Sequence, residues 1–192
     1  MKDQYYILIS KLDRFIRKYY KNQLIKGAIY SLSLLLLFFL AINIIEYFGQ
    51  FSTAVRTSLV LFYFVVGLFV IGKFIMIPVF KLIKIGKQIS HEQAAEIIGK
   101  HFPEVSDKLL NTLQLHKLSE SQQMKSDLLN ASIDQKVKEL KPIPFQSAID
   151  FRVNKKYLKY PIIPVILIAA IIIISPGMIT EPSNRLVNYN TH

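Results

Sequence analysis

Three long apolar runs constrain the fold of this chain more than any other feature of its sequence. They cover residues 27–45, 58–77 and 160–179, and Lys73 is the one charged side chain within them. About 19 residues of α-helix rise about 28 Å, close to the thickness of the hydrocarbon core of a bilayer. A soluble core would spread its apolar residues at helical or strand periods. The sequence therefore predicts an all-α membrane protein with three transmembrane helices.

The third run is the least regular of the three. Pro161 and Pro164 stand in its first turns, and Pro176-Gly177 lies near its end. Prolines are tolerated in a first turn because the N–H groups there have no helical partner. We expect residues 160–179 to span the membrane fully, and a re-entrant or peripheral segment is the alternative.

The placement of the cationic residues indicates both a partner and an orientation. The formal net charge of +11 would suit a nucleic-acid partner, but the lysines and arginines flank the apolar runs. Anionic lipid head groups and the positive-inside rule explain this placement better, so we expect a bilayer as partner and no nucleic acid. The cations gather in residues 1–26 and 78–159, whereas the loop 46–57 and the tail 180–192 hold one each. The N-terminus and the domain at 78–159 are therefore expected in the cytoplasm, with the loop and the tail outside.

Residues 1–26 form a basic, two-faced segment before the first run. Its apolar residues recur at steps of three and four: Tyr5, Ile9, Leu12, Phe15, Ile16 and Tyr19. Its opposite face carries cations: Lys11, Arg14, Arg17, Lys18 and Lys21. The pattern predicts an amphipathic helix that lies flat in the membrane interface, with these cations at lipid head groups. A soluble helix packed on residues 81–159 is the alternative. No small-x-small site follows the first apolar run, so we do not expect a cleavable signal peptide.

Polar side chains near the ends of the runs have two interpretations. Asn43 and Glu46 are expected to reach the head-group layer at the end of the first span, and a functional role inside the membrane is the alternative. Lys73 lies about one turn from the end of the second run, where its long stem can reach the basic side.

The polar residues 78–159 predict a small helical domain between spans two and three. Ser90 and Gln93 have the spacing of a capping box, which begins a helix that stops before Pro103. Two more helices are expected at 107–118, capped by Ser106, and at 120–140, capped by Ser119. Residues 141–159 contain two prolines that end the third helix, and the alternation in AIDFRV allows a short extended segment.

The predicted domain has narrow apolar stripes, so we expect three helices that lean on the spans or on a partner. The third helix would carry its stripe at Met124, Leu128, Ala131, Val137 and Leu140. Four polar residues beside the leucine stripe of the second helix are the candidate partner contact: Asp107, Lys108, Asn111 and Gln114.

No motif for chemistry is present in the sequence. The chain has no cysteine, which excludes disulfides, thiolate metal sites and cysteine nucleophiles. His91, His101, His116 and His192 lack metal-ligand spacing, and the glycines are scattered singly instead of forming a phosphate loop. We therefore predict no catalytic, cofactor or metal site and no enzyme activity.

One stretch resembles a known family. Residues 101–115, HFPEVSDKLLNTLQL, resemble a segment of a family of large, uncharacterised bacterial inner-membrane proteins. The N-terminal region of that family is similar in order: a basic helix, two spans, a cytoplasmic helical segment and a third span. The closing SNRLVNYNTH is similar to the point where those proteins pass into a long extracytoplasmic, β-rich region. The resemblance implies the first part of a longer envelope protein, and the family has no settled activity to carry over.

The function expected from these features is that of a non-enzymatic membrane anchor and scaffold. Its partners would be other membrane proteins or a second copy of the chain. The alternative is a small accessory subunit of a multi-component membrane machine, such as a secretion or transport complex, whose chain ends near His192. A third hypothesis is a lipid-handling protein that uses the basic N-terminal helix as a sensor.

Overall fold

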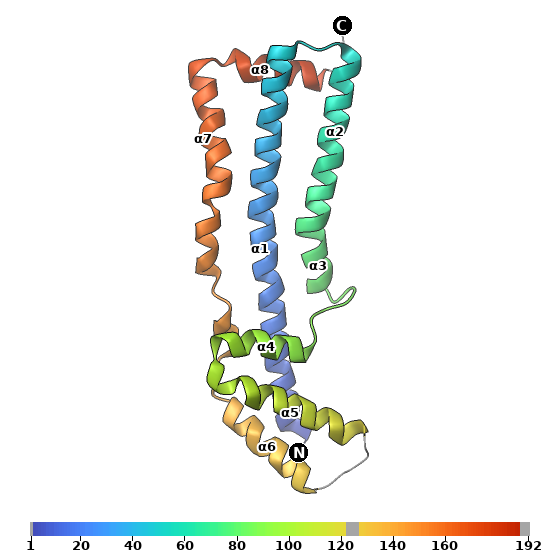
Figure 1. Cartoon of the computed structure of the whole chain (residues 1–192), viewed down its shortest axis with the longest axis vertical. Coiled ribbons are helices and arrows are strands. Elements are labelled where there is room, and N and C mark those ends of the chain that lie inside the picture. Colours follow the sequence, from blue (N-terminus) through green and yellow to red (C-terminus); the bar gives the residue numbers. More distant parts are fainter. Residues whose placement is uncertain (1, 122–126, 189–192) are drawn as a thin grey trace. The chain divides into compact units, whose positions relative to one another are not determined.

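The computed structural model describes residues 2–121 and 127–188, without the side chains of residues 2–4, 119–121 and 127–130. The regular structure of these residues is helical, as predicted (Figure 1). The α-helices are α1 (Lys2–Gly49), α2 (Thr53–Ile71), α3 (Ile77–Leu82), α4 (His91–His101), α5 (Pro103–Ser121), α6 (Asp127–Leu140), α7 (Lys159–Ile174) and α8 (Gly177–Val187). A π-helix, η1 (Gly72–Met76), joins α2 to α3, and two 3-10 helices, η2 (Phe145–Ala148) and η3 (Phe151–Tyr157), precede α7.

The chain divides into two compact units. Unit 1 comprises Met1–Asn22 and Lys81–Asp150, and unit 2 comprises Gln23–Phe80 and Phe151–His192. The long helix α1 contributes its first part to unit 1 and the remainder to unit 2.

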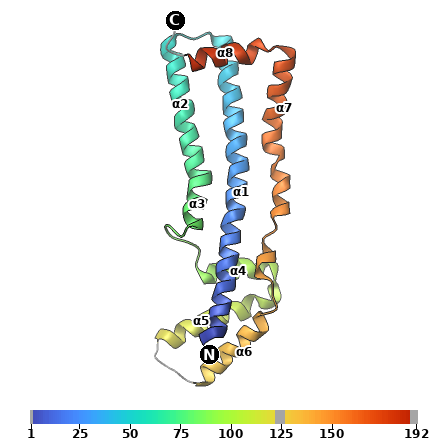
Figure 2. The same cartoon turned by 180° about the vertical axis from the view of Figure 1, so that it is seen from behind.

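Unit 1 is a small helical domain with a single apolar core. The first part of α1 packs among α4, α5 and α6 (Figure 2). Its buried residues from α1 are Leu8, Leu12, Phe15, Ile16 and Tyr20. Those from the other helices include Ala95, Ile98, Leu109, Leu113, Ile133, Val137, Leu140 and Phe145. The Tyr20 hydroxyl also accepts a hydrogen bond of 2.9 Å from the backbone N–H of Ile89.

The prediction that residues 1–26 lie flat in the membrane interface is wrong. Leu12, Phe15 and Ile16 face the core of unit 1, so this segment packs on the helical domain as the alternative interpretation expects. An amphipathic pattern has the same period whether its apolar face meets lipid or protein. The narrow apolar stripes of α4, α5 and α6 do not cover one another completely. The first part of α1 packs on the apolar surface that remains. Nor is there a separate helix, because α1 continues through Gly27 into the first apolar run.

The other predicted helices of unit 1 are present, with shifted ends. The capping box before α4 is confirmed, because the Ser90 hydroxyl accepts from the Gln93 N–H and the Gln93 side chain accepts from the Ser90 N–H. Helix α5 begins at Pro103 instead of Asp107, since proline suits the first helical position. Residues 145–157 form η2 and η3 instead of an extended segment. The predicted stripe residue Met124 lies outside the described residues, as do the side chains of Ser119 and Leu128.

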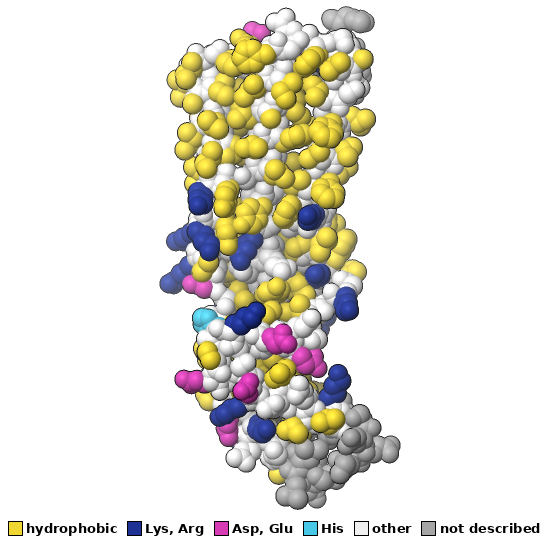
Figure 3. Space-filling view, viewed as in Figure 1, with side chains coloured by type: hydrophobic (Ala, Val, Ile, Leu, Met, Phe, Trp, Pro, Cys, Tyr) yellow, Lys and Arg dark blue, Asp and Glu magenta, His cyan; other side chains and the backbone are white. Residues whose placement is uncertain are grey.

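Three helical segments are long and apolar enough to cross a membrane, by length and composition. They are Tyr5–Gly49, Thr53–Leu82 and Phe145–Ile174. Unit 2 holds the apolar parts of all three, and hydrophobic side chains cover much of the visible surface of α1, α2 and α7 (Figure 3). Many of these side chains are exposed, among them Leu61 at 65% and Ile173 at 82%.

The third apolar run does not continue as one helix to residue 179. Helix α7 ends at Ile174, and α8 starts at Gly177 after a break at Ser175-Pro176. Helix α8 extends through most of the polar tail, lies across the ends of α1, α2 and α7 (Figure 1), and buries Ile179, Pro182 and Leu186. The tail is helical although it is short, because its apolar residues recur at helical steps and pack on the other helices of unit 2.

Candidate functional site

The most deeply buried polar side chains of unit 2 gather where α8 meets α1 and α2. Asn43 and Glu46 lie three residues apart on one face of α1, close to its end, and both are 0% exposed. We call Asn43, Glu46, Arg56, Ser183 and Arg185 the polar cluster. They come from three helices, since Arg56 is on α2 and the last two are on α8.

Glu46 is the centre of the charges in the polar cluster. The Arg56 Nε–H donates to Glu46 Oε1 over 2.9 Å, and Arg185 Nε lies 3.8 Å from the same oxygen. The side chains of Arg56 and Arg185 are 18% and 28% exposed, so both are partly accessible from outside the protein. No described residue donates a hydrogen bond to Glu46 Oε2. A buried carboxylate is costly unless it is paired, and here two guanidinium groups supply the compensation.

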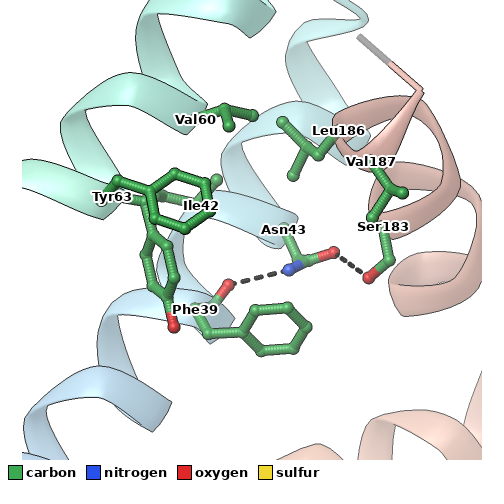
Figure 4. A pocket seen from close by; sticks show the side chains of 9 residues that line it. Phe39, Ile42, Asn43, Val60, Tyr63, Ser183, Leu186 and Val187 are labelled. Carbon is green, nitrogen blue, oxygen red and sulfur yellow. Dashed lines mark hydrogen bonds between the residues drawn. The ribbon is translucent and has the colours of Figure 1, made fainter. Parts of the chain in front are cut away.

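Asn43 holds α8 by a second contact. Its side-chain N–H donates to the Phe39 carbonyl over 2.9 Å, and its Oδ1 accepts from the Ser183 hydroxyl over 2.7 Å (Figure 4). Both polar ends of the Asn43 amide are therefore satisfied in a buried place. The polar cluster thus attaches α8 to α1 and, through Arg56 and Glu46, to the start of α2.

An apolar cavity of about 490 Å³ lies beside the Asn43–Ser183 hydrogen bond (Figure 4). Its apolar walls include Phe39 and Ile42 of α1, Val60 and Tyr63 of α2, and Leu186 and Val187 of α8. Among the described residues of this lining, Asn43, Ser183 and Tyr63 carry polar side-chain groups. The cavity offers room for apolar groups and few groups for chemistry.

The expectation that Asn43 and Glu46 reach the head-group layer is wrong, since their side chains are enclosed by protein. Sequence reasoning also missed Ser183 and Arg185 as their partners. A signal was present in the tail, where Ile179, Pro182 and Leu186 recur at helical steps and place Ser183 on a helix. The opposite charges of Glu46, Arg56 and Arg185 were a second signal.

The cations predicted to bind lipid head groups lie in unit 1. Lys11 donates to the backbone carbonyls of Lys141 and Ile143, and Lys18 donates to the Gln146 carbonyl over 2.8 Å. These two ammonium groups therefore hold the segment that follows α6. Arg14, Arg17 and Lys21 are exposed, and Arg14 donates to the Ser10 carbonyl and hydroxyl within its own helix.

The four residues predicted as partner contact are brought together on one exposed face of α5. Lys108 forms an ion pair of 2.9 Å with Glu139 of α6. The side chains of Asp107, Asn111 and Gln114 are exposed beside it, and Leu109 and Leu113 of the same helix are buried in the core.

The histidines that the structure describes have structural contacts. His91 Nε2 lies 3.0 Å from Asp13 Oδ1, and the His116 ring stacks on Tyr5 with ring centroids 3.5 Å apart. The His101 ring packs edge-on against Phe102. Within residues 2–121 and 127–188, no three His, Asp or Glu side chains gather in a way that could hold a metal ion. His192 lies outside those residues.

Comparisons with known proteins add no assignment. No family model matches this chain, and neither a curated protein nor a solved structure matches it. The class that the fold defines is therefore an all-helical protein with three helices that could span a membrane. The resemblance of residues 101–115 stays a prediction.

Proposed function

We propose that this chain is a non-enzymatic membrane anchor and scaffold that forms the N-terminal part of a larger envelope protein. The attachment of α8 carries the proposal. The buried polar side chains Asn43 and Glu46 are engaged in holding α8 against the other helices of unit 2. Helix α8 follows the last candidate span and is fixed to the other helices. Such a segment suits the anchor of an extracytoplasmic region.

In this proposal three helices cross a bacterial inner membrane, with the N-terminus and residues 78–159 in the cytoplasm. The charges of unit 2 support this orientation. At the end of the spans where α8 lies, the cations Arg56 and Arg185 are accompanied by the acidic residues Glu46 and Glu181. Lysines gather at the opposite end of the spans. The more cationic end faces the cytoplasm by the positive-inside rule.

Unit 1 would be the part that meets cytoplasmic or membrane partners, through the exposed face of α5 that holds Asp107, Lys108, Asn111 and Gln114. Support comes from the placement of these residues, because one helix presents all four outward while its other side fills the core. The partner would be another membrane protein or a second copy of this chain.

A second candidate function is a small accessory subunit of a multi-component membrane machine. The observation in its favour is the open surface of the spans. In the most apolar 18-residue stretch of Thr53–Leu82, only 6% is buried inside this chain. The corresponding share for Phe145–Ile174 is 11%. Such surfaces can pack against neighbouring subunits as well as against lipid.

The intact mass of the protein from its native membrane separates the two functions. The anchor proposal expects a mass several-fold larger than that of the 192-residue chain. A mass equal to that of the chain would refute the larger envelope protein and leave the accessory subunit.

Charge reversal tests the α5 face. The double variant Asp107→Lys, Lys108→Glu should lose the proteins that co-purify with the full chain, because it inverts the charge pattern of the face. Glu96→Lys, Lys100→Glu is the matched control, since both residues are exposed on α4 of the same unit. Unchanged partners in the first variant, or equal losses in both, would contradict a contact at this face.

A further inference from the structure

The charges of unit 2 are separated along the spans, and one end holds only cations. The acidic residues of Gln23–Phe80 and Phe151–His192 are Glu46 and Glu181, and both lie at the α8 end. The cations of the other end include Lys26 on α1, Lys73 on η1, Lys156 on η3 and Lys159 at the start of α7. Figure 3 shows cationic side chains gathered near the start of α7 on this face.

Aromatic rings bring these cations together. The Tyr30 ring lies 5.7 Å from Tyr160, 5.4 Å from Tyr157 and 6.4 Å from Phe74, measured between ring centroids. Four chain segments, α1, η1, η3 and the start of α7, therefore meet around Tyr30.

Each of the four lysines lies over one of these rings. The ammonium groups of Lys26 and Lys156 lie 5.5 and 5.1 Å from the Tyr157 ring centre. Lys73 lies 5.8 Å from Phe74, and Lys159 lies 5.4 Å from Tyr160. No described acidic side chain forms an ion pair with any of the four, so their positive charge is not compensated within the part of the chain that the structure describes.

An apolar cavity lies beside these aromatic rings. It has a volume of about 510 Å³ and is lined by Tyr30, Ser33, Leu34, Leu37, Phe74 and Tyr160. Two of its lining rings, Phe74 and Tyr160, are the rings beneath Lys73 and Lys159. Lys73 and Lys159 therefore lie over two rings of the cavity wall, and Leu34 and Leu37 continue that wall along α1.

We propose that this cavity binds an anionic phospholipid, with its phosphate at Lys26, Lys156 and Lys159 and an acyl chain along Leu34 and Leu37. The lysines, which have no acidic partner among the described residues, favour an anion, and the leucine walls favour a hydrocarbon chain, so one amphipathic anion suits both. Basic sites between membrane helices bind anionic head groups by the same chemistry. The start of α7 adds the partial positive charge of a helix N-terminus, and no acidic residue lies in its first turn. This site goes beyond the anchor function and depends only on the helices lying in a bilayer.

The chain has no tryptophan, so a single introduced tryptophan is a clean reporter of its lipid neighbours. Leu37→Trp places the reporter in the cavity, and Leu61→Trp places it on an exposed surface of α2 as the control. The full chain is reconstituted in vesicles that contain a small fraction of either brominated phosphatidylglycerol or brominated phosphatidylcholine, and quenching is measured. We expect Leu37→Trp to be quenched more strongly by the anionic lipid, and Leu61→Trp to be quenched equally by both. Equal quenching of Leu37→Trp by the two lipids would overturn the proposal.

Charge removal tests the phosphate contacts in the Leu37→Trp chain. Each lysine near an anionic lipid contributes about a fivefold change in affinity, so Lys26→Gln, Lys159→Gln should weaken the preference roughly thirtyfold. Lys84→Gln, Lys87→Gln removes the same charge from exposed positions in unit 1 and should keep the preference. Equal losses in both double variants would show general attraction to the membrane surface instead of a site. Displacement of the lipid by inorganic phosphate beyond that by chloride at equal ionic strength would show a simple anion site and overturn the lipid assignment.

Discussion

At the scale of single residues, Gly27 is the glycine of unit 2 with the least room for a side chain. A Cβ at Gly27 would overlap the backbone carbonyl of Phe74, so α1 and η1 pack there only because glycine has no side chain. We expect Gly27→Ala to force the two helices apart and to lower the stability of the chain by about 1–3 kcal/mol. Thermal unfolding of the full chain in detergent measures this loss.

Gly67→Ala is the matched control for that substitution. A Cβ at Gly67 would lie 3.6 Å from Leu35 Cδ2, which is an ordinary van der Waals contact. Alanine is favoured over glycine in a helix by roughly 0.5–1 kcal/mol, so this variant should be neutral or more stable. Equal destabilisation by both alanines would refute the close approach at Gly27.

Glu92 gives unit 1 a pH-dependent contribution to stability. Hydrogen bonds from its own backbone N–H and from the Ser90 hydroxyl lower the pKa of Glu92, and attraction to Lys117 lowers it further. A carboxyl whose folded-state pKa is lowered stabilises the fold above the unfolded-state pKa, and this stability is lost as the pH falls through the folded-state pKa. Glu92→Gln should therefore cost about 0.3 kcal/mol at neutral pH and nothing in strong acid.

The difference in stability between wild type and Glu92→Gln is measured from unfolding midpoints of the full chain between neutral pH and strong acid. Glu96→Gln serves as the control, because Glu96 is exposed and lies beyond the first turn of α4. A difference for Glu92→Gln that persists in strong acid would contradict the assignment.

At the scale of elements, α8 should depend on its hydrogen bond to α1. Ser183→Ala removes the donor to Asn43 and leaves the Asn43 oxygen buried without that hydrogen bond. The loss should be about 1–3 kcal/mol, the cost of an unsatisfied buried polar group. Hydrogen exchange of the α8 amides in the full chain, reconstituted in lipid, measures it.

Thr180→Ala is the control within α8, because the exposed Thr180 hydroxyl donates to the Pro176 carbonyl of the same segment. If the two alanine variants exchange at the same rate, the Ser183–Asn43 hydrogen bond does not hold α8.

Sequence patterns predicted where the helices of this chain lie better than they predicted what each helix packs against. The capping box at Ser90 is a local interaction between residues three apart, so the sequence contains all of it. The buried face at Leu12, Phe15 and Ile16 was predicted as apolar, but the period cannot distinguish lipid from a protein core. The partners of Asn43 and Glu46 lie far along the chain, at Ser183 and Arg185, and only the fold brings them together. Contacts of this kind are therefore the part of the candidate site that the sequence could not supply.

At the scale of the whole molecule, the proposed orientation can be tested because the chain has no cysteine. A single Ser52→Cys places a thiol at an exposed position between α1 and α2, and Asn111→Cys places one on the exposed face of α5. A membrane-impermeant maleimide should label the first variant in intact spheroplasts and the second only after permeabilisation. The reverse pattern would refute the orientation derived from the cations.

The π-helix η1 has a consequence for how the length of this chain can vary. Hydrogen bonds from i to i+5 fit one more residue into Gly72–Met76 than an α-helix of the same rise would hold. Loss of one residue there would let the stretch close into a regular helix, and the faces of α2 and α3 would stay in register. Loss of one residue elsewhere in α2 would turn every later side chain by about 100°. In an alignment of this chain with its homologues, single-residue deletions within this span should therefore fall at residues 72–76.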